Sequence, residues 1–230
     1  MLNIAEIFRS IDGEVNLWGQ GCLTTFIRLQ GCNLFTSNNS KSQCPYCDTK
    51  YAQDQNKKMY KMSVEDIVAL IPEGKVTITG GEPLLQNKTH NLIIALLNKG
   101  HKVSVETNGS LPIPRTIIND NLLSWIIDYK LHAQGEMYIN NFWNATSQDW
   151  IKFVIETPSD FQKAIDISEA LKGGGCKAKI AFSPVMKNND IWPAQWLVEK
   201  IIEKGLNDVV FNLQIHKLIW PKKKEGISLL

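Results

Sequence analysis

The chain has 230 residues, which is enough for one α/β domain with a sizeable core, and no Pro-, Gly- or Ser-rich linker divides it, so we predict a single domain over residues 1–230. Its longest apolar runs, such as 92–97, are far shorter than the roughly 20 residues of a membrane span, so we expect a cytoplasmic protein without a membrane partner. The formal charge of +2 and the isolated basic run 222–224 argue against a nucleic-acid partner.

Strand and helix patterns alternate along the chain. The expected strands cover residues 25–29, 76–79, 103–106, 125–129, 151–155, 179–182 and 209–213, and the expected helices cover 64–71, 89–99, 160–171 and 193–204. Ser63 is a good N-cap for the first of these helices, which Pro72 and Gly74 end. This alternation predicts a parallel sheet covered by helices. About six parallel strands favour a partial, open TIM-like β/α barrel over the closed barrel of eight.

Three cysteines, Cys32, Cys44 and Cys47, lie close together after the first predicted strand. Three thiolates can hold three irons of a [4Fe–4S] cluster and leave the fourth iron without a protein ligand. A cluster that only carries electrons normally takes four cysteines. The pattern therefore predicts an iron–sulfur site that also binds another molecule.

Two other uses of these cysteines remain open. A structural zinc ion needs four ligands, and the fourth would come from Cys22, Cys176 or a histidine. The histidines are His90, His101, His132 and His216. A disulfide framework agrees poorly with five cysteines and with the polar start Asn3–Arg9, in which we recognise no secretory leader. We expect Cys22 and Cys176 to be buried small hydrophobic residues.

Polar motifs follow the predicted strands at their carboxyl ends, where parallel sheets and barrels bind ligands. After the cysteine loop, these motifs are Gly-Gly-Glu-Pro at 80–83, Glu-Thr-Asn-Gly at 106–109, Asp-Tyr-Lys at 128–130, Ser-Pro at 183–184 and Gln-Ile-His-Lys at 214–217. Each motif alone is an ordinary turn or a half-buried side chain. Their convergence on one edge of the sheet predicts a binding site there.

The motifs together resemble the 7-carboxy-7-deazaguanine synthases, which are radical S-adenosylmethionine enzymes of queuosine and 7-deazapurine biosynthesis. The resemblance rests on 26–34, 44–49, 79–83, 105–109 and 214–217, in the family's order, and extends from Glu6 to Trp220. It implies an open barrel of the radical SAM type. It also implies a lyase that converts 6-carboxy-5,6,7,8-tetrahydropterin to 7-carboxy-7-deazaguanine. Hydrogen abstraction at C6, ring contraction, return of the hydrogen and loss of ammonia would regenerate S-adenosylmethionine.

The resemblance implies three cofactors: a [4Fe–4S] cluster, S-adenosylmethionine and Mg²⁺. Cys32, Cys44 and Cys47 match the cluster ligands, and Thr49 matches a hydroxyl ligand to Mg²⁺. The positions that match S-adenosylmethionine-binding residues are Tyr46, Gly81, Glu82, Thr107, Asp128, Lys130 and Gln214. Among these, Tyr46 is expected beside the adenine, and Gly81 and Glu82 beside the methionine amino group.

Four further residues match positions that bind the pterin: Glu14, Arg28, Thr79 and His216. The resemblance implies a catalytic role for Glu14, Arg28 and His216. An acidic side chain suits the guanidine-like edge of the pterin, and a basic one suits its carboxylate. The resemblance also implies a homodimer and an electron donor such as a flavodoxin or ferredoxin.

The chain departs from the family pattern in several places. Eleven residues, 33–43, separate the first two cysteines, and the C-terminal segment 220–230 is an extension. Asp12 replaces the usual Gln of a Gln-Gly-Glu motif, and Asp128-Tyr129 replaces the usual Ser-Pro before Lys130.

Two alternative functions remain open. A glycyl-radical-enzyme activase would share the cluster motif, but it needs no set of polar residues around a small heterocycle. A non-catalytic zinc or iron–sulfur module would need a fourth ligand and leaves the strand-end motifs without a role.

Overall fold

A computed structural model describes residues 1–36, 41–42, 44, 46–54, 59–114, 121–131, 137–186, 192–220 and 226–230. The strands of its main sheet are β1 (Leu2–Ile11), β2 (Leu23–Leu29), β5 (Tyr60–Met62), β6 (Lys75–Gly80), β7 (Lys102–Thr107), β8 (Leu123–Tyr129), β9 (Trp150–Ile155), β10 (Lys179–Pro184), β11 (Val209–Phe211) and β12 (Ile227–Ser228). The helices are α1 (Val64–Leu70), α2 (Thr89–Asn98), α3 (Asn140–Trp143), α4 (Pro158–Gly173), α5 (Trp192–Glu203) and α6 (Ile215–Ile219). Short 3₁₀ helices cover Lys50–Ala52 and Pro83–Leu85, and β3 (Phe35–Thr36) pairs with β4 (Lys41–Ser42).

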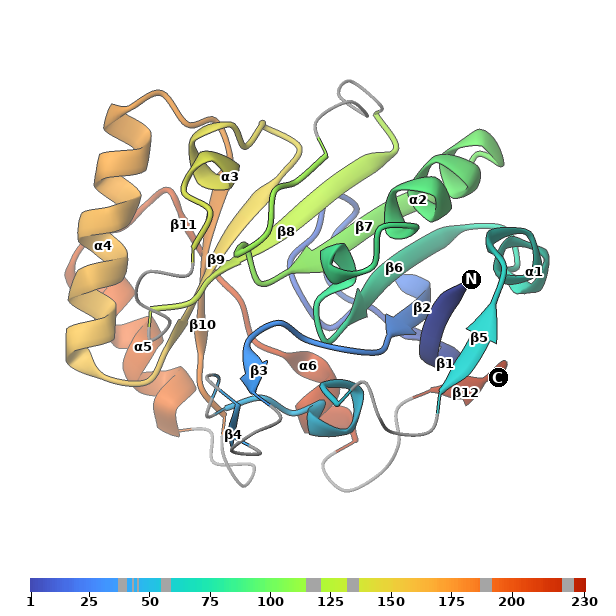
Figure 1. Ribbon diagram of the computed structural model, residues 1–230. Helices are drawn as coiled ribbons and strands as arrows, with labels where there is room; N and C mark the ends of the chain where they lie inside the picture. Colours follow the sequence, from blue (N-terminus) through green and yellow to red (C-terminus); the bar gives the residue numbers. More distant parts are fainter. Residues whose placement is uncertain are drawn as a thin grey trace.

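The strands of the main sheet follow the order β11-β10-β9-β8-β7-β6-β2-β1-β12, and β5 also pairs with β1 (Figure 1). From β2 through β6 to β11 every neighbouring pair is parallel. Helices α2, α4 and α5 pack against β7, β9 and β10 respectively. Because β11 and β12 end the sheet at opposite edges without pairing, the barrel is open, as the sequence predicts.

The core lies between the sheet and the helices. Alternate strand residues such as Ile27, Ile78, Val105 and Ile127 are completely or almost completely buried, and α2 adds apolar side chains including Leu92. This alternation places the intervening residues on the concave side of the sheet. The concave side is therefore left for polar groups.

Two helix starts show how the sequence positions these elements. Ser63 Oγ accepts a hydrogen bond of 3.0 Å from the Asp66 amide, which confirms the predicted cap of α1. Thr157 and Asp160 form a reciprocal capping box, with Pro158 in the first turn. Helix α4 therefore begins two residues before the predicted start.

Strand β1 was not predicted from the sequence. It pairs antiparallel with β2, and the register shifts between Ile4 and Glu6. Such a bulge breaks the alternation of buried and exposed residues that identifies a strand in a sequence. The C-terminal extension also joins this edge, because β12 pairs with Phe8 and Arg9 of β1. The basic run 222–224 lies outside the described residues.

In the part of the chain that the structure describes, no helix has the length and apolar character needed to cross a bilayer.

Candidate active site

One cavity of about 580 Å³ lies at the carboxyl ends of the parallel strands. Its volume falls in the range of roughly 300–1,000 Å³ that is usual for ligand sites. The structure brings fourteen of the predicted site residues to its wall. They are Glu14, Arg28, Cys32, Cys44, Tyr46, Cys47, Thr49, Thr79, Gly81, Thr107, Asp128, Lys130, Gln214 and His216. Glu82 is the predicted site residue that does not line the cavity.

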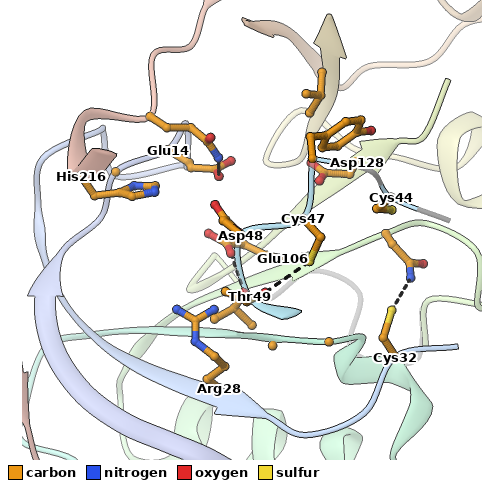
Figure 2. Close-up of a pocket in the computed structure, with 18 of the residues that line it drawn as sticks. Glu14, Arg28, Cys32, Cys44, Cys47, Asp48, Thr49, Glu106, Asp128 and His216 are labelled. Atoms are coloured by element: carbon orange, nitrogen blue, oxygen red, sulfur yellow. Dashed lines mark hydrogen bonds between the residues drawn. The ribbon is translucent and has the colours of Figure 1, made fainter. Parts of the chain in front are cut away.

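The three cysteines lie on one side of the cavity, and Glu14 and His216 lie on the opposite side (Figure 2). Cys32 follows β2 in a loop that is held by a hydrogen bond of 3.1 Å from its amide to Gln53 O. Burial raises the pKa of the Cys32 thiol to about 11, so this thiol needs a nearby positive charge, such as that of a metal, to ionise. None of the five cysteines, all of which are described, is part of a disulfide.

The donor set, three thiols that line one cavity, fits an iron–sulfur cluster. Across the described ranges, no three His, Cys, Asp or Glu side chains converge tightly enough to hold one metal ion. In a cluster each thiolate binds its own iron, so three thiols spread around one end of a cavity are compatible with it. Cys22 and Cys176 are half-buried and do not line this cavity, whereas His132 lies outside the described residues.

The loop after β6 packs directly on the cysteine loop. The Gly81 amide donates to Leu29 O at 3.1 Å, and the Glu82 amide donates to Gly31 O at 2.8 Å. A Cβ atom on Gly81 would lie 2.1 Å from Gly31 O and 2.9 Å from Cys32 N. Only glycine therefore allows this approach of two backbones, which leaves the main chain of the loop open to the cavity.

The Glu82 side chain differs from the expectation that it faces the methionine amino group. It is fully buried and accepts hydrogen bonds from Leu84 N at 2.9 Å, Asn108 N at 2.7 Å and Thr107 Oγ1 at 2.8 Å. Burial nevertheless raises its pKa. These three hydrogen bonds tie the turn 83–85 to the end of β7, and the Glu82 side chain does not line the cavity.

A chain of alternating charges crosses the cavity floor. The Lys152 ammonium pairs with Glu14 Oε2 and lies 3.0 Å from Asp128 Oδ1. Asp128 Oδ2 lies 2.5 Å from Lys130 Nζ. Gln214 Nε2 donates to Glu14 Oε1 at 2.5 Å, so this predicted S-adenosylmethionine residue contacts a predicted pterin residue. These contacts join the loop after β1, strands β8 and β9, and the segment before α6.

The charges in this network stabilise one another. Burial alone would lower the pKa of Lys152, but Asp128, Glu14 and Glu106 raise it well above the ordinary lysine value. Burial likewise opposes ionisation of Asp128, but Lys130 and Lys152 lower the pKa of this carboxyl below its usual range. Both partners are therefore charged at neutral pH. The Lys130 ammonium also lies 5.7 Å from the centre of the Tyr46 ring.

Glu106 is a titratable group of this cavity whose pKa is raised far above that of an ordinary carboxyl group. Burial, followed by repulsion from Glu14 and Asp12, raises its pKa to about 8. Thr79 Oγ1 donates a hydrogen bond of 2.7 Å to Glu106 Oε2. A carboxyl group in this state can give or take a proton at the cavity wall.

The basic side chains on the remaining wall are held by neighbours. Arg28 Nε lies 2.9 Å from Glu6 Oε1. Lys217 Nζ lies 3.0 Å from Asp48 Oδ2. Burial would raise the pKa of Asp48, but the charge and hydrogen bond of Lys217 have the larger combined effect and lower it. The His216 ring lies against the backbone of Gly13, where a Cβ atom would be 2.1 Å from His216 Nδ1.

Sequence reasoning gave no role to Lys152. Its neighbours along β9 are buried apolar residues on both faces, Trp150 on the same face and Ile151 and Phe153 on the other. A lysine within such a strand needs a buried partner for its charge. A lone lysine in an apolar strand was therefore the sequence signal that could have identified Lys152. Glu106 was quoted only as part of a motif, although its carboxyl group lines the cavity.

Comparisons with known proteins agree with this geometry. A family model described as the Radical SAM superfamily matches residues 27–213. A 7-carboxy-7-deazaguanine synthase of Clostridium acetobutylicum is 37% identical over 97% of this chain and 98% of its own length. Proteins with the same name from Chlorobaculum tepidum and Koribacter versatilis are 33% and 31% identical, each over 98% of this chain.

A solved structure supports the fold alone. Streptococcus suis SuiB bound to S-adenosylmethionine superposes with a TM-score of 0.58 at 15% identity. The match covers 80% of this chain and 48% of the SuiB chain.

Proposed function

The chain belongs to the radical SAM superfamily and, within it, to the 7-carboxy-7-deazaguanine synthases, and from this premise we propose how its residues divide the reaction. The enzyme is a lyase of queuosine biosynthesis that forms 7-carboxy-7-deazaguanine from 6-carboxy-5,6,7,8-tetrahydropterin with loss of ammonia. Its cofactors are a [4Fe–4S] cluster, S-adenosylmethionine and Mg²⁺. The comparisons do not favour a glycyl-radical-enzyme activase.

One observation carries the division of roles. A single cavity has three thiols at one side and Glu14 and His216 at the other, and Lys152 pairs Glu14 with Asp128 between the two sides. A redox centre and a small polar substrate can therefore occupy the same cavity. When bound, the reduced cluster and S-adenosylmethionine supply the radical that takes hydrogen from the substrate.

The cysteine side would hold the cofactors. Cys32, Cys44 and Cys47 would bind the cluster, and the bare backbone beside Gly81 would accept hydrogen bonds from the methionine ammonium group. Tyr46 would lie against the adenine, with its ring fixed beside Lys130. Asp128 and Thr107 would support this wall from β8 and β7.

The opposite side would hold the pterin. Glu14 would accept hydrogen bonds from the guanidine-like edge of the pterin, and Gln214 would fix the direction of that carboxylate. Arg28 would attract the substrate carboxylate, and Thr49 would reach the Mg²⁺ that binds it. Glu106, with Thr79 beside it, would exchange a proton with the substrate nitrogen. His216 would close the wall above Glu14.

Three statements about the enzyme in its cell complete the proposal. The electron would come from a small carrier such as a flavodoxin or ferredoxin, the enzyme would work in the cytoplasm, and it would act as a homodimer. Size-exclusion chromatography with light scattering tests the last of these directly.

The test of the proposed function is an anaerobic assay of the reconstituted enzyme. The enzyme is incubated with reductant, S-adenosylmethionine, Mg²⁺ and 6-carboxytetrahydropterin, and the products are analysed by mass spectrometry. We expect a 7-carboxy-7-deazaguanine peak without an equal accumulation of 5′-deoxyadenosine. If 5′-deoxyadenosine forms while the pterin is unchanged, the substrate assignment is wrong.

A further inference from the structure

A buried ion pair lies behind the substrate wall of the cavity. Asp12 is 1% exposed and Lys75 is 7% exposed, and neither residue lines the cavity. The Lys75 ammonium pairs with Asp12 Oδ2, and Thr77 Oγ1 donates to the same oxygen at 3.0 Å. The Trp18 ring covers Lys75, with its centre 5.8 Å from Nζ. Burying such a pair costs desolvation energy that an apolar pair would not.

The second oxygen of Asp12 faces the active site loop. Asp12 Oδ1 accepts a hydrogen bond of 3.1 Å from the backbone amide of Glu14. The Asp12 backbone also closes the base of this loop, because its amide donates to Cys22 O at 2.8 Å and its carbonyl accepts from Gly21 N at 2.7 Å. One side chain therefore contacts both the buried cation and the main chain of Glu14.

The arrangement links the pterin wall to the parallel sheet. Lys75 and Thr77 belong to β6, whereas Glu14 lies in the connection between β1 and β2. We propose that Asp12 and Lys75 are positioning residues that fix the main chain of Glu14, and so the direction of its carboxylate toward the pterin. This inference rests on the proposed function, because Glu14 is the residue through which the pair acts. Lys75 orients the Asp12 carboxylate where the family usually has a neutral glutamine.

Two double variants that differ only in the side chain at position 12 test the inference. Asp12→Asn/Lys75→Met removes both charges but keeps an oxygen that can accept from the Glu14 amide. Asp12→Leu/Lys75→Met removes the charges and the oxygen at similar volume, which buried pairs often tolerate. The dissociation constant for the pterin is measured anaerobically on the cluster-loaded enzyme by calorimetry.

The oxygen-keeping variant should bind the pterin within about twofold of the wild-type affinity, and the apolar variant about tenfold more weakly, as expected for one lost hydrogen bond near the ligand. The affinity for S-adenosylmethionine and the electron paramagnetic resonance spectrum of the cluster should be unchanged in both. Asp12→Ala/Lys75→Met gives the same comparison if the apolar variant does not fold.

Thr24→Val is the matched control, because Thr24 Oγ1 bonds Thr77 Oγ1 at 2.9 Å in the same buried cluster without touching Asp12. It should lower the unfolding temperature and leave the pterin affinity unchanged. Equal pterin affinities in the two double variants would overturn the inference, as would a parallel loss of S-adenosylmethionine binding. A wild-type enzyme that does not bind the pterin would instead overturn the proposed function.

Discussion

Lys152 Nζ lies 3.0 Å from Asp128 Oδ1, and the same ammonium pairs with Glu14, so one cation from β9 joins the cofactor wall to the substrate wall. The Lys152 side chain is 5% exposed, and Asp128 and Glu14 are 18% and 11% exposed. The desolvation cost of burying these charges offsets much of their attraction, so the network adds little net stability and mainly fixes the positions of its side chains. Removing one partner nevertheless leaves buried charges unpaired, which is destabilising.

Lys152→Met should therefore impair both folding and turnover. Two carboxylates lose a buried partner, so we expect the free energy of unfolding to fall by about 3 kcal/mol. Pterin turnover should fall at least about tenfold, because the direction of Glu14 is no longer fixed. Urea unfolding and steady-state kinetics measure the two effects. Lys163→Met, at an exposed position on α4, is the control and should change neither. Unchanged kinetics in Lys152→Met would contradict the assigned role.

Gly81→Ala should displace the cysteine loop. The new methyl group would collide with Gly31 O and Cys32 N, and both are backbone atoms that cannot turn aside. We expect a lower cluster content per chain, measured by iron and sulfide analysis, and a loss of about 2 kcal/mol in stability. Gly173→Ala is the matched control, because no atom lies within 4 Å of its added carbon and its backbone is helical. Full cluster content in Gly81→Ala would refute the packing argument.

Cys44→Ala and Glu14→Ala should separate the two sides of the cavity. The first variant should lose the cluster absorbance and the cleavage of S-adenosylmethionine. The second should keep the cluster and lose pterin turnover by about a hundredfold or more, as is typical for removal of a positioned acid or base. Cys176→Ala, whose Sγ lies 3.1 Å from Phe142 O away from the cavity, should keep both properties. Equal cluster loss in both active-site variants would contradict the division.

Glu106 should make the stability depend on pH in a defined window. Its pKa is about 8 in the folded state, above the ordinary value of 4.5, because of burial and the neighbouring carboxylates. Below pH 4.5 Glu106 is protonated in both the folded and the unfolded chain, and its favourable contribution to folding stability is complete. As the pH rises from 4.5 to 8, the unfolded chain releases this proton and the folded chain keeps it, so stability is lost. Above pH 8 the loss is complete.

Glu106→Gln should remove this part of the pH dependence. At pH 5 the variant and the wild type should have similar stability. At pH 8.5 the variant should be more stable than the wild type. Thermal unfolding from pH 4.5 to 9 provides the measurement. Parallel curves for the two proteins would show that Glu106 keeps an ordinary pKa.

Much of the fold could be predicted because local patterns agree with the tertiary structure. Helix α1 begins at its predicted cap, and the parallel strands β2 and β6 to β11 lie where short β-branched and apolar runs occur, whereas β3, β4 and β5 were not predicted. Strand β1 was missed because the bulge between Ile4 and Glu6 hides its alternation. The pairing of β12 with β1 joins the two ends of the chain and has no local pattern.

The sequence alone predicted most of the candidate site residues that the cavity brings together, from the family resemblance and from motifs at the ends of parallel strands, which must meet at one edge of the sheet. It did not determine how their side chains share contacts. Only the tertiary structure decided that the Glu82 carboxylate is buried and bonded to Thr107, that Gln214 donates a hydrogen bond to Glu14, and that Lys152 lies between two carboxylates. Those roles depend on distances between groups far apart in the chain, and on the burial that makes each unpaired charge costly, neither of which is encoded in spacing along the sequence.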